Sequence, residues 1–123
     1  MFDHLEFAVA DIEAARRFYG SIYDAIGGRE VFYDQDNKSC GFGTSDIVHL
    51  LLTEATATTP RLHFCFTAQS KHDVERAYLA ALSSGGVCNG KPGYRDHYSA
   101  GYFAAFVLDP DGHNVEMLHR EQS

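Results

Sequence analysis

One order of elements occurs twice along the chain, and this internal repeat limits the possible folds more than any other feature. An offset of 59 residues brings the two halves into register and matches His4 with His63, Phe7 with Phe66, Arg17 with Arg76, and Tyr19 with Tyr78. Each half reads as a strand and a helix followed by further strands. The repeat therefore predicts an α+β fold made of two βαβββ modules, with one helix covering one face of each sheet.

The first half begins with alternation over residues 3–9, where Leu5, Phe7 and Val9 form one apolar face. Asp11 then offers a helix N-cap, and apolar residues recur at helical spacing until two glycines, Gly27 and Gly28, end the run. Shorter segments rich in strand-forming residues follow. We predict strands at residues 30–33, 39–42 and 47–53.

The second half repeats this pattern after a segment without periodicity at residues 54–60. We predict a strand at 62–67, a helix that begins with the Ser70-x-x-Asp73 capping box, a loop at 89–93, and strands at 102–108 and 114–119. The whole chain, residues 1–123, is expected to form a single domain. Its two modules are expected at about 1–53 and 61–120.

Composition excludes several classes of partner. The chain has 123 residues and a net charge of −7, so it lacks the positive field that attracts nucleic acid or anionic lipid. Its longest apolar stretch, residues 103–108, is far too short to cross a bilayer, and no signal peptide is recognised, so we expect a cytoplasmic protein. The three cysteines are far apart and are expected to be free thiols.

Four residues with metal-binding side chains occupy related strands of the two modules. His4 and His63 begin the first strand of each half, while an offset of 67 places His49 and Glu116 on the last strands. Strand alternation turns all four away from the helix. Two imidazoles and one carboxylate on such a face are typical of a divalent metal site with open positions, although strand histidines are also often structural. His72 and His113 are expected to be structural.

At these residues the sequence resembles the vicinal oxygen chelate superfamily, which includes glyoxalase I, extradiol dioxygenases, fosfomycin-resistance transferases and bleomycin-resistance proteins. The resemblance extends from the segment His4-Leu5-Glu6-Phe7 to the ending Asp109-Pro110-Asp111-Gly112-His113-Asn114-Val115-Glu116, which is its most specific part. It is most similar to short glyoxalase-like members. The resemblance implies a cupped sheet that encloses the site, with His4, His63 and Glu116 as metal ligands.

The identity of the metal and of the reaction stays open at this point. Two histidines and one glutamate suit Zn, Fe, Ni, Co or Mn. Glyoxalase I carries a glutamate ligand on the strand where this chain has His49, whereas the extradiol and fosfomycin enzymes use His, His and Glu. We expect Glu116 and His49 to be the catalytic groups, with His49 acting as a fourth ligand, as a residue supporting the ligands, or as a wall of the pocket.

The segment 93–102 concentrates aromatic and hydrogen-bonding residues before a strand. We expect Arg95, His97, Tyr98 and Tyr102 to contact substrate, with Arg95 holding an anionic group through its planar guanidinium. The alternative is a tyrosine-rich loop that only covers the end of the barrel. If they do contact substrate, these four residues form the rim of the site and shape it, but they do not hold the metal.

The sequence supports three hypotheses of different classes. The leading one is a metal-dependent enzyme whose ion chelates neighbouring oxygens of a small substrate, with a lyase or isomerase, a dioxygenase or a transferase reaction. The second is an antibiotic- or metabolite-binding protein without turnover, and the third is a structural or regulatory interaction protein. A homodimer is also expected, in which His4 and His49 of one subunit meet His63 and Glu116 of the other.

Overall fold

The structure, a computed structural model, describes residues 2–121 and consists of two βαβββ modules. The predicted α+β class is confirmed. The first module contains β1 (Leu5–Val9), α1 (Ile12–Ile26), β2 (Arg29–Asp34), β3 (Ser39–Thr44) and β4 (Ile47–Glu54). The second contains β5 (His63–Thr67), α2 (Lys71–Ser83), β6 (Val87–Tyr94), β7 (Tyr102–Leu108) and β8 (Asn114–Arg120).

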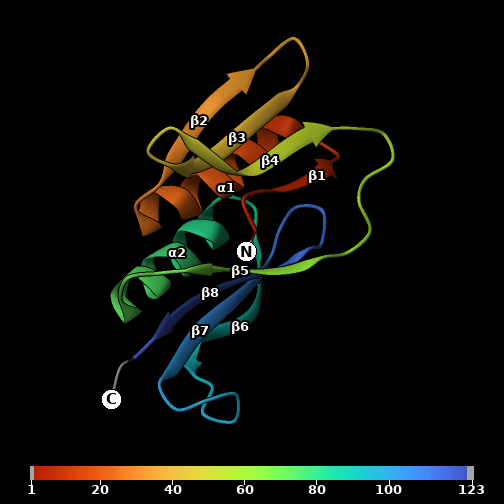
Figure 1. Ribbon diagram of the computed structural model, residues 1–123. Helices are drawn as coiled ribbons and strands as arrows, with labels where there is room; N and C mark the ends of the chain where they lie inside the picture. The colour runs from red at the N-terminus through yellow and green to blue at the C-terminus, as the bar shows by residue number, and fades with distance from the viewer. Residues whose placement is uncertain (1, 122–123) are drawn as a thin grey trace.

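Each module forms a mixed sheet of four strands. The strand orders are β1-β4-β3-β2 and β5-β8-β7-β6, and the first strand of each module runs parallel to the last. Figure 1 shows the two sheets one above the other, with β1 and β5 on the facing sides. The helices α1 and α2 contact each other, so the modules share one packed interior.

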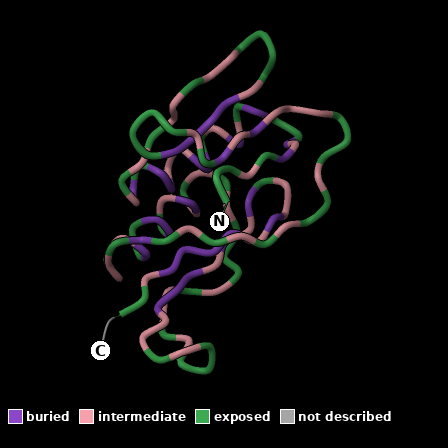
Figure 2. Tube along the Cα trace, in the orientation of Figure 1, coloured by how far each residue is buried: buried purple, intermediate pink, exposed green. Residues whose placement is uncertain are grey.

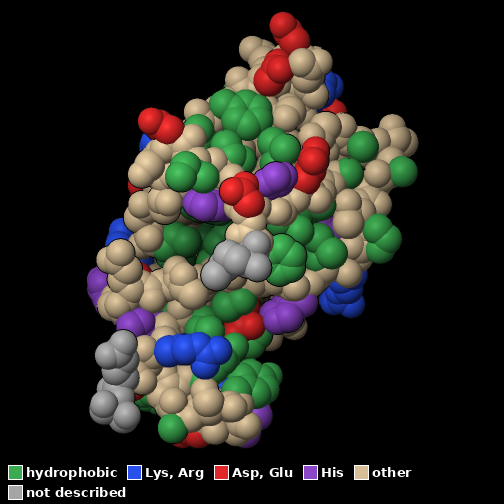
Figure 3. All heavy atoms as spheres, viewed as in Figure 1, with side chains coloured by type: hydrophobic (Ala, Val, Ile, Leu, Met, Phe, Trp, Pro, Cys, Tyr) green, Lys and Arg blue, Asp and Glu red, His purple; other side chains and the backbone are tan. Residues whose placement is uncertain are grey.

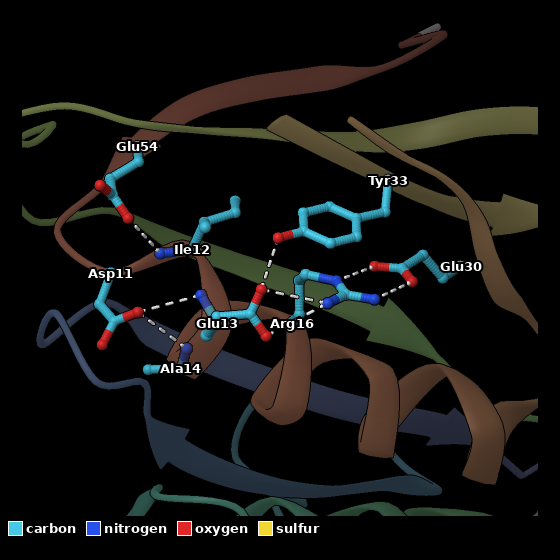
Figure 4. A network of polar contacts seen from close by, with 8 residues as sticks. All are labelled: Asp11, Ile12, Glu13, Ala14, Arg16, Glu30, Tyr33 and Glu54. Atoms are coloured by element: carbon cyan, nitrogen blue, oxygen red, sulfur yellow. Dashed lines mark hydrogen bonds and ion pairs between the residues drawn. The ribbon is translucent and has the colours of Figure 1, made fainter. Parts of the chain in front are cut away.

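Polar contacts fix the start of α1, as Figure 4 shows. The Asp11 carboxylate accepts hydrogen bonds from the amides of Glu13 and Ala14 at 3.0 and 3.2 Å, which satisfies donors that have no partner within the helix. Arg16 binds both carboxylate oxygens of Glu30 on β2 at 2.7 and 2.8 Å. Through the Arg16–Glu30 contacts, the polar face of α1 is attached to strand β2 of its sheet.

The second helix has a simpler cap. The Ser70 hydroxyl accepts a hydrogen bond from the Asp73 amide at 3.0 Å, as the capping sequence predicted. Both helices are followed by a glycine with positive φ, Gly27 at 95° and Gly85 at 98°, a conformation that side chains with a Cβ disfavour. Neither α1 nor α2 is long and apolar enough to cross a membrane.

Aromatic side chains join the two modules. Phe7 of β1 packs against Phe64 of β5, with 5.6 Å between ring centroids, and the Tyr19 hydroxyl of α1 donates a 2.5 Å hydrogen bond to the buried Asp109 carboxylate. Figure 2 shows that buried positions concentrate in the helices and in the strands beneath them, whereas loop tips are exposed. The junction is therefore part of the hydrophobic core.

One segment differs from expectation. Residues 89–93 are predicted as a loop, but they lie inside strand β6, which pairs with β7. The ladder contains two register shifts around Gly90 and Gly93, and β6 is an edge strand. Glycine and proline weaken strand patterns in sequence, yet edge strands with bulges tolerate both.

Candidate functional site

His63 and Glu116 form the central contact of the candidate site. His63 is the first residue of β5, and Glu116 lies in the middle of the neighbouring β8. Their side chains lie on the sheet face opposite α2, where His63 Nε2 approaches Glu116 Oε1 at 3.2 Å. Half of the His63 side chain is exposed, whereas Glu116 is buried.

The hydrogen bonds of His63 indicate which ring nitrogen carries hydrogen. Nδ1 lies 3.0 Å from the Asn114 carbonyl oxygen, which can only accept, so Nδ1 is the donor. In the neutral ring the Nε2 lone pair then faces the Glu116 carboxylate. Two such electron-rich groups stay close only with a cation between them, either a proton or a metal ion. The pair therefore fits a divalent metal as two of its ligands.

Two further side chains surround Glu116. Tyr102 of β7 donates a short hydrogen bond to Glu116 Oε2, so the two carboxylate oxygens have different partners. Partial burial and this carboxylate raise the pKa of Tyr102, which keeps its hydroxyl protonated at neutral pH. Cys65 is exposed, but desolvation of its thiol by the atoms packed around it, together with the nearby Glu116, raises its pKa to about 12. Cys65 is therefore a neutral thiol beside the pair.

His4 and His49 lie on the first module, close to each other in register. Residues Leu5 and Leu50 are paired across β1 and β4, and the two histidines immediately precede them. His4 Nδ1 contacts Asp3 Oδ1 at 2.8 Å, and His49 Nδ1 contacts the Asp3 carbonyl oxygen at 3.0 Å. As in His63, an oxygen acceptor at Nδ1 leaves Nε2 with the lone pair that a metal requires.

A cavity of about 390 Å³ lies between the modules, and we call it the junction cavity. Figure 3 shows histidine and hydrophobic side chains around the hollow between the two sheets. Its walls are mostly apolar. The lining residues are Phe2, Asp3, His4, Leu5, Tyr23, His49, Leu50, Leu62, His63, Phe64, Cys65 and Phe66. Three of the four candidate metal ligands, the histidines, thus line the junction cavity. Glu116 lies on the other side of His63.

Within residues 2–121, no three His, Cys, Asp or Glu side chains lie close enough together to hold one metal ion. The structure brings His63 and Glu116 together, and it keeps His4 and His49 on the first module. One chain by itself therefore presents the His63–Glu116 pair on β5 and β8 and a pair of histidines, His4 and His49, on the other module.

The strand register corrects the pairing of His49 with Glu116. Leu5 pairs with Leu50 in the first module, and the corresponding Phe64 pairs with Val115 in the second. His49 is therefore equivalent to Asn114, and Glu116 is equivalent to Leu51. The offset of 67 is wrong by two residues, because a register shift in the β3–β4 ladder and a longer β7–β8 turn change the spacing. His49 and Glu116 hold different positions.

The rim residues have different surroundings. Arg95 donates to the carbonyl oxygens of Gly93, Ala104 and Lys91 at 2.7, 3.1 and 2.8 Å, so it braces the β6–β7 hairpin. Tyr98 and Tyr102 line a second depression, also about 390 Å³, which we call the Tyr102 cleft. His97 packs on Tyr98 with 4.3 Å between ring centroids and does not line this cleft.

Two polar residues of the Tyr102 cleft were missed by sequence reasoning. The lining residues are His63, Tyr98, Ser99, Tyr102, Phe106, Glu116 and Arg120. Arg120 follows Glu116 by four residues on β8, and alternation places it on the same face. That spacing was a usable signal, whereas the approach of Ser99 depends on the conformation of the 95–101 loop.

The sequence matches the model of the Glyoxalase/Bleomycin resistance protein/Dioxygenase superfamily over residues 1–117. Among curated proteins, the uncharacterized protein YqjT of Bacillus subtilis (strain 168) is 29% identical over 129 residues, covering 94% of this chain and 95% of that protein.

Solved structures have the same fold over almost the whole chain. A glyoxalase/bleomycin resistance protein from Albidiferax ferrireducens T118 superposes with a TM-score of 0.82 at 25% identity, covering 98% of this chain and 99% of that one. A glyoxalase/bleomycin resistance protein/dioxygenase family enzyme from Burkholderia phytofirmans PsJN gives 0.72 at 14% identity, covering 97% and 98%. The second similarity concerns the fold alone.

Proposed function

Because this chain belongs to the glyoxalase/bleomycin resistance protein/dioxygenase superfamily, we propose that it is a divalent-metal-dependent enzyme acting on a small substrate with two neighbouring oxygens. The observation that carries the proposal is the His63–Glu116 contact. His63 Nε2 lies 3.2 Å from Glu116 Oε1, and each group has an outer hydrogen bond: His63 Nδ1 donates to the Asn114 carbonyl, and Tyr102 donates to Glu116. Such support is typical of residues that bind metals.

We propose His4 as the third ligand, supplied by a second subunit. His63 and Glu116 of one chain would then meet His4 of the partner subunit. Exposed hydrophobic side chains on the first module support a dimer: Phe32 is 38% and Ile47 is 55% exposed, although both belong to strands. Zn, Fe, Ni, Co and Mn remain the candidate ions.

The chemistry divides between the ion and the side chains. When bound, the metal acts as a Lewis acid that polarises a substrate oxygen. Tyr102 holds the Glu116 carboxylate in one orientation by donating to Oε2. His49 is the proposed proton acceptor, because its Nδ1–H donates to the Asp3 carbonyl and its Nε2 keeps a lone pair. Glu116, the other proposed catalytic group, would act as a ligand.

Metal content tests the ligand set. The untagged protein, purified without chelator, should contain about one divalent ion per chain by elemental analysis. Glu116→Gln and His63→Ala should each lose the metal, because they remove a charge or a donor that the ion needs. His72→Ala, which changes an exposed residue of α2, is the matched control and should keep it. Normal stoichiometry in both site variants would refute the proposal.

Mixing two variants tests the shared site. Neither His4→Ala nor His63→Ala should bind metal alone. In a mixed dimer, the intact His4 and the intact His63–Glu116 pair would meet in one of the two sites, so mixing should restore metal binding. A monomer in light scattering that retains metal at micromolar concentration would rule out the intersubunit arrangement.

Oxygen uptake separates the reaction classes. Anaerobic loading with Fe(II), followed by catechol and oxygen, should give uptake if the protein is a dioxygenase. A redox-inert metal without uptake favours a lyase, an isomerase or a transferase. The alternative, an antibiotic- or metabolite-binding protein, is supported by the apolar walls of the junction cavity. Ligand binding without turnover of any tested substrate would favour it.

A further inference from the structure

Arg120 is the one permanently cationic side chain among the residues that line the Tyr102 cleft. It is the last residue of β8, it pairs with Tyr102 across the β7–β8 ladder, and its side chain is exposed. It is thus at the rim of the depression whose floor contains Glu116. An arginine in this position faces both the solvent and the proposed metal ligands.

The guanidinium of Arg120 has weak protein partners. Nη1 donates to the Ser99 hydroxyl at 3.3 Å, and Cζ lies 5.0 Å from the centroid of the Tyr102 ring. In the portion of the chain that the structure describes, no carboxylate oxygen lies within 4.0 Å of it. A guanidinium offers five N–H donors in a planar fork, so Arg120 retains donors for an oxyanion.

Arg95, the arginine nearest in sequence to the rim tyrosines, differs in this respect. Three backbone carbonyl oxygens receive its hydrogen bonds, and its Cζ lies 5.4 Å from the centroid of Phe106. Moving these donors to a ligand would leave carbonyls of the β6–β7 hairpin without partners. Binding an anion would therefore break fewer hydrogen bonds within the protein at Arg120 than at Arg95.

The charges and walls of the cleft limit the ligand further. Among its lining residues Glu116 is the one with a carboxyl group and Arg120 the one with a guanidinium, and Glu116 already contacts His63 and Tyr102. In the metal-free cleft, one free positive charge balances a monoanion, whereas a dianion would keep an uncompensated charge. The rings of Tyr98 and Tyr102 meet edge to face at 5.1 Å and provide apolar surface for a planar group.

We propose that the Tyr102 cleft binds small planar monocarboxylates, and that Arg120 is the residue that holds the carboxylate. The inference rests on the proposed function for the identity of the site, since the body of the ligand would extend from Arg120 toward His63 and Glu116. Ser99, whose hydroxyl accepts from Arg120 Nη1, also lines the cleft. Arg95 is a positioning residue of the hairpin.

Three probes of similar shape test this inference: benzoate, neutral benzamide and phenylphosphonate, which is largely dianionic near pH 8. Binding is measured by ligand-observed NMR and calorimetry at pH 8, on the protein as purified and again after chelator treatment. Benzoate should bind at least 10-fold tighter than benzamide in both preparations, and tighter than phenylphosphonate after chelator treatment, when no metal ion is present to coordinate the phosphonate. Arg120→Gln should weaken benzoate binding about 10- to 100-fold, because a charge-assisted hydrogen bond is lost.

Arg120→Lys should recover only part of the affinity, because an ammonium lacks the planar fork. The matched control is Arg29→Gln, which removes an equal charge from an exposed ion pair with Asp46 in the first module and should leave benzoate binding unchanged. Metal content should be the same in all three variants. Circular dichroism and the melting temperature verify that each variant is folded.

Several outcomes overturn the inference. Equal affinity for benzoate and benzamide, an unchanged Arg120→Gln variant, or tighter binding of phenylphosphonate to the chelator-treated protein would each do so. The result is separable from the proposed function. Arg120-dependent benzoate binding in a protein that never retains metal would refute the metal enzyme and keep the carboxylate site. Normal metal content without carboxylate selectivity would refute the carboxylate site and keep the metal enzyme.

Discussion

The two modules share a topology, but their equivalent positions do different work. Tyr19 of α1 and Tyr78 of α2 coincide in the repeat. Tyr19 donates a hydrogen bond to the buried Asp109 across the junction between the modules, whereas the nearby Cys88 of its own module raises the pKa of Tyr78. The first module therefore supplies contacts that hold the chain together, and the second contains the Tyr102 cleft. A repeated fold does not require a repeated function.

The sites differ in the same way. In the second module, His63 lies diagonally across the ladder from Glu116 and contacts it. In the first module, His4 has the equivalent place, but the residue equivalent to Glu116 is Leu51. At this equivalent position, only the second module has a carboxylate. This asymmetry is why we place a complete metal site between subunits and not in each module.

The largest expected effect concerns the two tyrosines. Tyr19→Phe should lower the free energy of unfolding by about 2 kcal/mol, because one oxygen of the buried Asp109 carboxylate loses its hydroxyl donor. Tyr78→Phe should have a clearly smaller effect. Urea unfolding followed by circular dichroism measures both. Equal losses in the two variants would contradict the assignment of the junction to the first module's tyrosine.

The second effect concerns one arginine on each helix. Arg16→Gln should lower the free energy of unfolding by about 1 kcal/mol. The Arg16 guanidinium donates two short hydrogen bonds to Glu30, and its side chain is only 26% exposed. Arg76→Gln should cost less than about 0.5 kcal/mol, since its contacts to Asp73 and to the Ala25 carbonyl are both 3.4 Å long. The same urea titrations test this ranking, and a reversed order would refute it.

The third prediction concerns acid stability in the first module. The Ile12 amide, and then Lys38, lower the pKa of Glu54 below its ordinary value of 4.5. A lowered pKa in the folded state means that ionised Glu54 stabilises the protein above pH 4.5 and that this contribution disappears as the pH falls through the lowered pKa.

Melting temperatures of the native protein and of Glu54→Gln should therefore differ at pH 7 and converge near pH 3. Glu75→Gln, which changes an exposed residue of α2, is the control and should follow the native curve more closely at pH 7. A constant difference between the native protein and Glu54→Gln at all pH values would show that the interaction does not depend on ionisation.

The smallest effect concerns the cysteines. Burial raises the pKa of Cys40 to about 12, whereas the Tyr78 hydroxyl and the Gly90 amide lower the pKa of the exposed Cys88. Iodoacetamide at pH 8 should modify Cys88 long before Cys40, because the thiolate is the reactive form. Tyr78→Phe should slow the modification of Cys88 about threefold. Mass spectrometry of the labelled peptides gives both rates, and an unchanged rate would exclude the Tyr78 contact.

Local patterns were sufficient to predict most elements. The local sequence was enough to predict both helices, their N-caps at Asp11 and Ser70, and the glycines that end them. The structure confirms all of these. Strand β6 was missed because its glycines and proline carry no strand signal, and only pairing with β7 makes it a strand. Local propensity cannot report on a partner that is distant in sequence.

By itself the sequence determined the repeat, the α+β class and the set of side chains able to bind a metal, since these depend on periodicity and residue type. The tertiary structure decided which of them meet. Because of a bulge and a long turn, Glu116 and His49 occupy positions that differ by two residues. Arg95 donates its hydrogen bonds to backbone carbonyl oxygens, and strand alternation places Arg120 at the Tyr102 cleft. Register and side-chain direction depend on contacts between distant segments, and a one- or two-residue change alters every neighbour.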